Sequence, residues 1–236
     1  MKTKMMIAVM AVAGAVSTSS AFAQSVTDLG AVTTVGASVA HDKVQTMKTH
    51  TPTTYGIFVD HGNKMTATSG VIYDFGVDMT HGKTDELKYN NLGLQGQAGY
   101  RMSVADSLSV DALGGLSYNK FTIKSDDGDT KYKHPTLKAG VGANYFASQE
   151  TSLRAEVGYT YSFEGQMKDQ SSTPSSSADL KNTTNPYVEL SVLNTSTGLP
   201  VFASVYHTKT TYKFDYQDST AKDSQAVTGL KVGVAF

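Results

Sequence analysis

The strongest constraint on the fold is a regular alternation of apolar and polar residues that recurs along most of the chain. The alternation is clearest from Leu153 to Glu164, where every odd-numbered residue is apolar and every even-numbered residue is polar or glycine. Successive side chains of a β-strand point to opposite sides, so this segment presents one apolar face and one polar face. A helix would spread both sets around its circumference. The pattern therefore predicts β-strands.

Ten strands are expected from this alternation. They cover residues 29–43, 53–61, 67–80, 91–103, 107–123, 135–146, 151–164, 186–194, 201–216 and 226–236. Most have ten residues or more, whereas strands of soluble sheets usually have about five or six. A tilted strand needs about 9–11 residues to cross a bilayer. The sequence therefore predicts an all-β fold, an antiparallel up-and-down transmembrane β-barrel of about ten strands, with eight strands as an alternative.

The connections between the predicted strands alternate in length. Long polar connections are expected at residues 42–52, 81–90, 124–134, 165–185 and 217–225. Tight turns are expected around Gly62-Asn63, Ala105-Asp106, Ser148-Gln149 and Ser196–Pro200. This asymmetry is typical of membrane barrels, in which short periplasmic turns alternate with long extracellular loops. Removing two strands would break the alternation, so ten strands are favoured over eight.

The N-terminus has the features of an export signal. A positively charged start precedes the apolar run Met5–Val16, and residues 21–23 fit the small-x-small rule for signal-peptidase cleavage. The apolar run is too short to cross about 30 Å of hydrocarbon as a helix. We expect a signal peptide at residues 1–23 and a barrel domain at residues 24–236.

The average composition hides the two faces of the strands. A mean hydropathy of -0.25 is that of a soluble protein, and a soluble periplasmic β-sandwich stays open as an alternative. Basic and acidic residues number 20 and 21, so no basic excess predicts a nucleic-acid partner. The chain contains no cysteine, which excludes disulfides, thiolate metal sites and cysteine catalysis.

The polar faces of the strands carry charges of both signs, as a closed interior requires because buried charge of one sign is costly. The predicted lumen charge network comprises Asp74, Asp78, Arg101, Asp111, Lys138, Arg154, Glu156, Glu189 and Lys231. Arg101 and Asp111 are expected to meet across the turn between their strands. Two interpretations stay open: the charges hold the wall together, or His207, Lys209 and Lys138 line a conducting path.

Aromatic residues near the strand ends predict two girdles at the membrane surfaces. The outer girdle is expected to comprise Tyr118, Tyr161, Phe163, Tyr212 and Phe214, and the periplasmic girdle Tyr100, Tyr145, Phe202 and Phe236.

The last strand ends on Phe236, with Leu230, Val232 and Val234 at alternate positions before it. This resembles the C-terminal signature of bacterial outer-membrane proteins, and the resemblance implies an assembly signal and the barrel-assembly machinery as a partner. Together with the signal peptide and the ten strands, it resembles the small outer-membrane β-barrel superfamily of Gram-negative bacteria, which includes the OmpX/Ail-like and opacity-type barrels and the transmembrane part of OmpA.

The resemblance implies an outer-membrane location and contact with outer-membrane lipid and lipopolysaccharide. It also implies roles in adhesion to host-surface or matrix molecules, or in slow solute passage. We expect a non-enzymatic barrel whose surface loops bind host or envelope molecules, with a narrow porin-like channel as the alternative.

Enzymes of similar architecture supply a further, weaker alternative. Omptin proteases carry Asp-x-Asp and Asp-x-His pairs, whereas this chain has only Asp127-Gly128-Asp129 and no Asp-x-His. Lipid A deacylases carry a His-x-Ser arrangement, whereas the most similar segment of this chain, His207-Thr208-Lys209, has no serine. No catalytic, cofactor-binding or metal-binding residues are expected.

Overall fold

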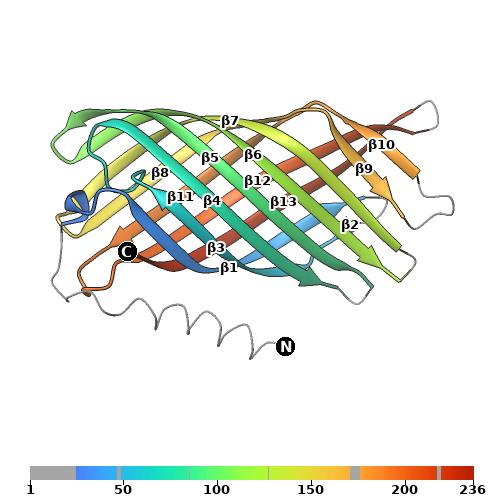
Figure 1. Ribbon diagram of the computed structural model, residues 1–236, viewed down its shortest axis with the longest axis horizontal. Helices are drawn as coiled ribbons and strands as arrows, with labels where there is room; N and C mark the ends of the chain where they lie inside the picture. The colour runs from blue at the N-terminus through green and yellow to red at the C-terminus, as the bar shows by residue number, and fades with distance from the viewer. Residues whose placement is uncertain (1–24, 47–48, 85, 127, 171–175, 217–218) are drawn as a thin grey trace.

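The computed structural model describes residues 25–46, 49–84, 86–126, 128–170, 176–216 and 219–236. Among these residues, ten strands pair antiparallel with their chain neighbours and close into a ring, which confirms the predicted barrel (Figure 1). The ring consists of β1 (Val32–Gln45), β3 (Thr53–Gly62), β4 (Gly70–Lys83), β5 (Lys88–Ala105), β6 (Leu108–Ser125), β7 (Gly128–Ser148), β8 (Thr151–Ser162), β11 (Thr183–Asn194), β12 (Val201–Tyr216) and β13 (Ser219–Ala235). Long alternating strands form a closed sheet because closure satisfies every backbone hydrogen bond within the bilayer.

Three short strands extend the wall at one end of the barrel. They are β2 (Thr49–His50), which pairs with β1, β9 (Gly165–Asp169), which pairs with β7, and β10 (Ser176–Lys181), which pairs with β9 and β12. A single turn of 3-10 helix, η1 (Val26–Asp28), precedes β1. In the described part of the chain, no helix is long and apolar enough to cross a membrane. The predicted signal peptide lies outside the described residues.

At the opposite end of the barrel, the last strand, β13, ends beside the start of the first strand, β1. The backbone of Phe236 exchanges hydrogen bonds of 2.8 and 3.0 Å with that of Thr33. The short connections between β5 and β6 and between β7 and β8 lie at this end as well (Figure 1). Outer-membrane barrels carry their longer extensions on the extracellular side, so the end of the barrel that bears β2, β9 and β10 points out of the cell.

Exposed apolar side chains form a band around the outside of the wall, which we call the apolar belt. It includes Val39 on β1, Tyr55–Val59 on β3, Val71–Met79 on β4, Leu94–Val104 on β5, Val110–Tyr118 on β6, Leu137–Tyr145 on β7, Leu153–Tyr161 on β8 with Phe163 just after it, Val188 and Leu190 on β11, Val201 and Val205 on β12, and Leu230 and Val232 on β13 with Phe236 just after it. Of the predicted girdle residues, Tyr118, Tyr161, Phe163, Tyr100, Tyr145 and Phe236 are exposed in this belt.

The strands continue well beyond the apolar belt on the extracellular side. On β12 and β13 the ladder runs on from the pair His207–Thr228 to the pair Asp215–Thr220. The segments 81–90, 124–134 and 217–225, which we predicted as loops, are therefore largely strand in their described residues. The sequence does not reveal these extensions because neither face meets lipid there, so apolar and polar residues do not alternate.

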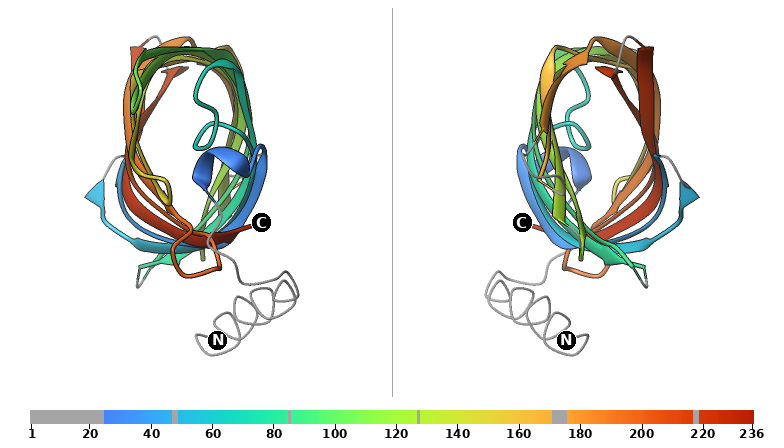
Figure 2. Two further views of the ribbon diagram at one scale, coloured as in Figure 1. Left: turned by 90° about the vertical axis from the view of Figure 1, so that its left-hand side faces the viewer. Right: turned by 90° about the vertical axis from the view of Figure 1, so that its right-hand side faces the viewer.

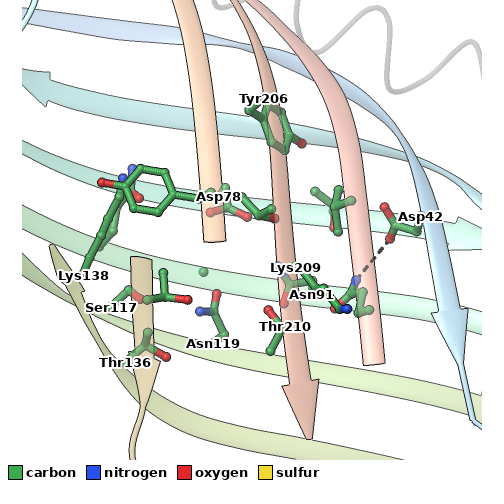
Figure 3. Close-up of a pocket in the computed structure, with 18 of the residues that line it drawn as sticks. Asp42, Asp78, Asn91, Ser117, Asn119, Thr136, Lys138, Tyr206, Lys209 and Thr210 are labelled. Carbon is green, nitrogen blue, oxygen red and sulfur yellow. Dashed lines mark hydrogen bonds between the residues drawn. The ribbon is translucent and has the colours of Figure 1, made fainter. Parts of the chain in front are cut away.

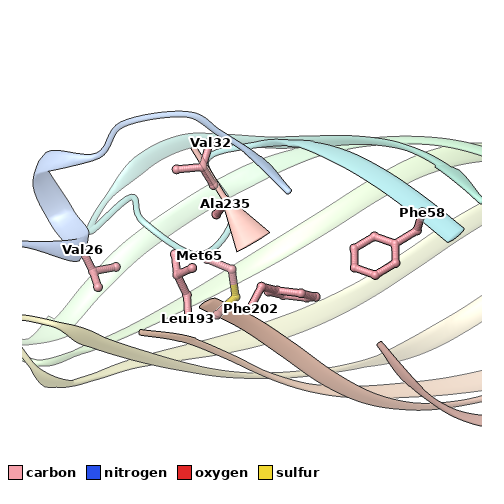
Figure 4. Packing of buried hydrophobic residues seen from close by; sticks show 7 residues of the cluster. All are labelled: Val26, Val32, Phe58, Met65, Leu193, Phe202 and Ala235. Atoms are coloured by element: carbon pink, nitrogen blue, oxygen red, sulfur yellow. The ribbon is translucent and has the colours of Figure 1, made fainter. Parts of the chain in front are cut away.

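The periplasmic end of the interior is filled by a group of apolar side chains that we call the base cluster. It comprises Val26, Val32, Phe58, Met65, Leu193, Phe202 and Ala235 (Figure 4). The rings of Phe58 and Phe202 meet edge to face with their centroids 6.1 Å apart. Phe202 was predicted for the periplasmic girdle, but it lies inside the barrel with 8% of its surface exposed.

The two faces of β12 are the reverse of what we predicted along its whole length: the residues expected outside lie inside, and those expected inside lie outside. Tyr212 and Phe214, predicted for the outer girdle, are buried inside the barrel. His207, predicted for the lumen, is exposed and hydrogen-bonds Thr228. Lys209 lies on that exposed side too, although part of it borders the cavity described below. The lower half of β12 carries large apolar residues on both faces, Val201 and Val205 on one and Phe202 and Tyr206 on the other, so alternation alone could not tell inside from outside.

Candidate functional site: the barrel lumen

The connection between β3 and β4, residues 63–69, folds into the barrel rather than forming the predicted tight turn, and we call it the inserted segment. Figure 2 shows it inside the ring together with η1. Arg101 on β5 donates from Nη1 to the carbonyl of Ala67 at 2.5 Å and from Nη2 to that of Lys64 at 2.8 Å. The hydroxyl of Thr66 donates to the carbonyl of Gly30. Side chains of the wall thus hold this segment in the lumen, where Met65 joins the base cluster.

A buried cluster of ion pairs lies beside the inserted segment. Asp111 on β6 accepts hydrogen bonds from Arg101 Nε at 2.9 Å and Nη2 at 2.7 Å. Its two carboxylate oxygens also accept from Arg154 Nη1 and Nη2 on β8 at 2.7 and 2.9 Å. Gly142 of β7 lies against this pair, where a side chain would overlap both Arg154 and Asp111. The geometry is bidentate, which is the strong form of an arginine–carboxylate contact.

Glu156 extends the cluster toward the middle of the lumen. It accepts a hydrogen bond from Arg154 Nη2 at 3.1 Å and one from the Tyr187 hydroxyl at 3.1 Å. Lys138 Nζ lies 3.1 Å from Glu156 Oε1 and 4.1 Å from the centroid of the Tyr187 ring. Lys64 of the inserted segment lies 3.5 Å from Glu156 and 3.5 Å from Asp74. The charges of the whole cluster link five wall strands, β4 to β8, to the inserted segment.

The structure thus brings six of the nine predicted lumen residues into one connected cluster: Asp74, Arg101, Asp111, Lys138, Arg154 and Glu156. Lys64 completes it, and sequence analysis missed this residue because it lies in a connection, where no alternation assigns a face.

Within the described residues, the other three predicted residues make no ion pair with this cluster, but two of them lie beside it. Lys231 Nζ is 3.8 Å from Asp60 and 5.1 Å from the centroid of the Phe58 ring. Glu189 accepts hydrogen bonds from Ser204 at 2.7 Å and Ser191 at 3.2 Å. Glu189 and Lys231 line a small cavity together with Lys64 and Asp74, and Asp78 borders a larger cavity that Lys231 also lines.

Burial in the periplasmic half of the lumen is nearly complete. Arg101 is 0% exposed, Glu156 1%, and Arg154 3%. A continuous aqueous path wide enough for ions would leave these charged side chains in contact with water. The described side chains therefore exclude water around Arg101, Arg154 and Glu156, with a small cavity left beside them.

A cavity of about 210 Å³ lies on the extracellular side of the ion cluster (Figure 3). Most of the residues that line it are of polar types, with many hydroxyl and amide side chains, among them Asn91, Ser117, Asn119 and Thr136. A smaller cavity of about 40 Å³ lies beside the base cluster and Lys64. Gln95, Glu189 and Lys231 border both cavities.

A second apolar group, which we call the outer cluster, spans the lumen beyond the apolar belt. It comprises Val44, Tyr89, Phe121, Tyr132, Leu180, Tyr212 and Phe214. Tyr132 from β7 and Tyr212 from β12 meet with ring centroids 4.5 Å apart, and Phe121 from β6 stacks on Tyr212 at 6.5 Å. The Tyr132 hydroxyl donates to Asp223 at 2.8 Å. Opposite walls are therefore packed together above the membrane.

Asp42 on β1 lies between the apolar belt and the outer cluster. Thr54 and Gln225 donate hydrogen bonds to its carboxylate at 3.4 and 3.2 Å. Burial disfavours the charged form and raises the pKa of Asp42 to about 6, although these hydrogen bonds oppose the shift. At neutral pH Asp42 is therefore still mostly ionised, and holding this carboxylate in a buried position costs folding free energy.

We expect the Asp42→Asn variant to be more stable than the natural protein at pH 8, by up to ~3 kcal/mol for this shift, and we expect the difference to shrink as the pH falls through 6 and to vanish below about pH 4. A folded-state pKa raised from 3.8 to about 6 costs stability that is fully present above pH 6 and is lost as the pH falls to the unfolded-state value. The measurement is the denaturant midpoint of barrels folded in phospholipid vesicles. An unchanged pH dependence in the variant would show that Asp42 does not cause it.

Comparison with known proteins agrees with the architecture. The family model for the outer membrane protein β-barrel domain matches residues 8–192. The translocator domain of autotransporter NalP from Neisseria meningitidis is 12% identical, with 100% of this chain and 95% of that chain covered and a TM-score of 0.51. This likeness shows the fold.

Two further solved structures are more distant. The outer membrane protease OmpT from Escherichia coli is 7% identical, with 89% and 96% covered and a TM-score of 0.47. The attachment invasion locus protein Ail of Yersinia pestis is 11% identical, with 88% and 99% covered and a TM-score of 0.35. No curated protein matches the chain.

Proposed function

The chain belongs to the outer membrane protein β-barrel domain family, and we propose that this outer-membrane barrel is a non-enzymatic surface-binding protein. Its extracellular hairpins would contact host-surface or envelope molecules. The observation that carries the proposal is the packed outer cluster. It supports the parts of the paired strands that extend beyond the apolar belt on the extracellular side, which we call the platform.

The platform is suited to binding because its backbone is held in place from inside. Strands beyond the belt pair along β6 and β7 as far as Ser125 and Gly128. The hairpin of β9 and β10 continues the wall between β7 and β12. Outward-facing residues on such a scaffold are presented at fixed spacing, which lowers the entropy lost when a partner binds.

A narrow channel is the second candidate, and the polar cavity of about 210 Å³ favours it. Against it, the inserted segment and the base cluster occupy the periplasmic side, and the aromatic rings of the outer cluster span the extracellular side. A channel would require both to move. Binding at the outer surface requires neither.

An enzymatic role has less support from the site. Asp129, at the predicted Asp-x-Asp, lies 3.7 Å from Lys124 and 3.8 Å from Lys131. His207 donates to or accepts from Thr228, with no carboxylate among its described hydrogen-bond partners. Neither residue lies within a described arrangement that would activate water.

Shortening the β9–β10 hairpin tests the proposal. Gly165 and Leu180 are cross-strand partners, so residues 166–179 can be replaced by a two-residue Asn-Gly turn. Cells of a non-adherent strain that produce this variant should lose most of the binding to cultured epithelial cells and immobilised laminin that the natural barrel confers. Heat-modifiable gel mobility verifies that the variant barrel is assembled.

The matched control replaces Asp106-Ser107, in the periplasmic turn between β5 and β6, with the same Asn-Gly pair. We expect this variant to bind like the natural barrel. Full binding by a barrel in which the β9–β10 hairpin and the outer connections 46–52, 84–87, 126–127 and 217–218 are all replaced would contradict the proposal.

A further inference from the structure

Lysines face one another across neighbouring strands on the outer surface of β4 to β7. Lys120 on β6 is the cross-strand partner of Lys133 on β7. Lys88 on β5 is paired with Lys83 on one side and with Lys124 on the other. Like charges directly opposite one another destabilise a sheet unless something neutralises them. Three such juxtapositions within adjacent strands indicate that an anion belongs between them.

With their neighbours on β7 and β9 these residues form a continuous surface, which we call the lysine patch. It comprises Lys83, Lys88, Lys120, Lys124, Lys131, Lys133 and Lys168. Five of the seven are exposed, and Lys131 and Lys133 are half-buried. Asp129 neutralises part of the charge of Lys124 and Lys131. In the described part of the chain, the pair Lys120 and Lys133 has no carboxylate within ion-pair distance.

The patch begins directly at the extracellular edge of the apolar belt. Leu92 of β5 is the cross-strand partner of Lys120, and Tyr118, two residues below Lys120 on β6, is an exposed belt residue. A step of two residues along a strand is about 7 Å. The ammonium groups of this pair therefore lie where the headgroups of the outer leaflet begin.

We propose that the lysine patch binds the phosphate groups of the glycolipid in the surrounding outer leaflet, lipid A. The pair Lys120 and Lys133 forms the centre of this site, with the other patch lysines above it. A phosphate between two opposed ammonium groups converts their repulsion into two charge-assisted contacts. The site lies on the lipid-facing wall, so it is distinct from the hairpin tips and does not depend on the proposed function.

The position of the lysine patch at the edge of the apolar belt favours a membrane lipid over a soluble polyanion as its ligand. A soluble polymer meets the hairpin tips first, and the chain has a second opposed pair there, Lys213 and Lys222 on β12 and β13. That pair lies near the end of its hairpin, far above the apolar belt. It is therefore a matched control: the same residue type, the same cross-strand geometry, but away from the lipid headgroups.

The test reconstitutes the full barrel in phosphatidylcholine vesicles containing lipid A or lipid A from which both phosphates have been removed. Lipid A retained by the detergent-extracted barrel is quantified for the natural protein, for Lys120→Gln/Lys133→Gln and for Lys213→Gln/Lys222→Gln. We expect the natural barrel and the control variant to retain lipid A equally, and the Lys120→Gln/Lys133→Gln variant to retain at least fivefold less. Removal of the phosphates should reduce retention by the natural barrel to the same low level.

Three results would overturn the assignment. The first is equal loss of lipid A from both double variants, and the second is undiminished retention of the dephosphorylated lipid. The third is displacement of lipid A from the natural barrel by a soluble sulfated oligosaccharide at micromolar concentration, with that binding lost in Lys120→Gln/Lys133→Gln, which would make the patch a site for soluble polyanions. Folding of each variant is verified by heat-modifiable mobility, so that lost binding is not mistaken for lost structure.

Discussion

Replacing Arg101 with alanine will destabilise the folded barrel by about 3–5 kcal/mol, the usual cost of removing one partner from a buried ion pair. The side chain is 0% exposed and bonds both Asp111 and two carbonyls of the inserted segment. Asp111 keeps its bidentate contact with Arg154, but the carbonyls of Lys64 and Ala67 lose their donor. The measurement is the urea midpoint in phospholipid vesicles, with the folded fraction followed by heat-modifiable mobility.

Two variants make the Arg101 result interpretable. Arg101→Lys keeps the charge but cannot donate to the carboxylate and both carbonyls at once, so an intermediate loss is expected. Lys168→Ala, at an exposed position, should change stability by no more than about 0.5 kcal/mol. A loss below about 1 kcal/mol in Arg101→Ala would mean that the inserted segment is not held by this residue.

Replacing Phe121 with alanine will loosen the extracellular platform without disturbing the membrane-spanning wall. Phe121 is 2% exposed and packs against Tyr89, Tyr132 and Tyr212. Truncating a buried phenylalanine costs about 3–5 kcal/mol, and here the loss falls on hairpins that can open locally. Because each 1.4 kcal/mol is tenfold in an equilibrium constant, tryptic cleavage after Lys213 should accelerate by at least tenfold.

The control for Phe121 is a phenylalanine in the apolar belt. Phe163 is 39% exposed and lies outside the outer cluster, so Phe163→Ala should leave the rate of cleavage after Lys213 unchanged. Equal acceleration in the two variants would indicate general destabilisation. No acceleration in Phe121→Ala would contradict the view that the outer cluster holds the platform together.

The membrane-spanning wall could be predicted from sequence because lipid imposes a single rule on it. Every second residue of a segment such as Leu153 to Phe163 must be apolar, and the opposite face encloses polar groups. That rule located all ten wall strands and also placed Arg101 and Asp111 on the inner face, where the structure pairs them directly.

The features that decide whether the lumen is open could not be predicted in this way. The inserted segment belongs to no strand, so Lys64 and Met65 carry no signal of direction. Tyr212 and Phe214 are aromatic residues inside the barrel beyond the membrane, where an apolar side chain marks a packed interior rather than a lipid contact. Alternation identifies two faces, but only the ring as a whole determines which of them is inside.

The structure gives the position of the C-terminal strand, but it does not test the assembly signal that the resemblance implies for this strand. Leu230, Val232 and Phe236 are exposed on the outside of the wall, and Phe236 closes the ring against Thr33. Recognition of this strand by the barrel-assembly machinery stays a prediction.

Side chains of the chain itself pack across both ends of the lumen, and we therefore propose that the barrel does not conduct. The most direct test is the current through the natural protein, folded and inserted into a planar bilayer, with a porin reconstituted in parallel to verify that open pores are detected. We expect no resolvable current through the natural barrel at any voltage below membrane breakdown. A steady conductance from the natural barrel would contradict it.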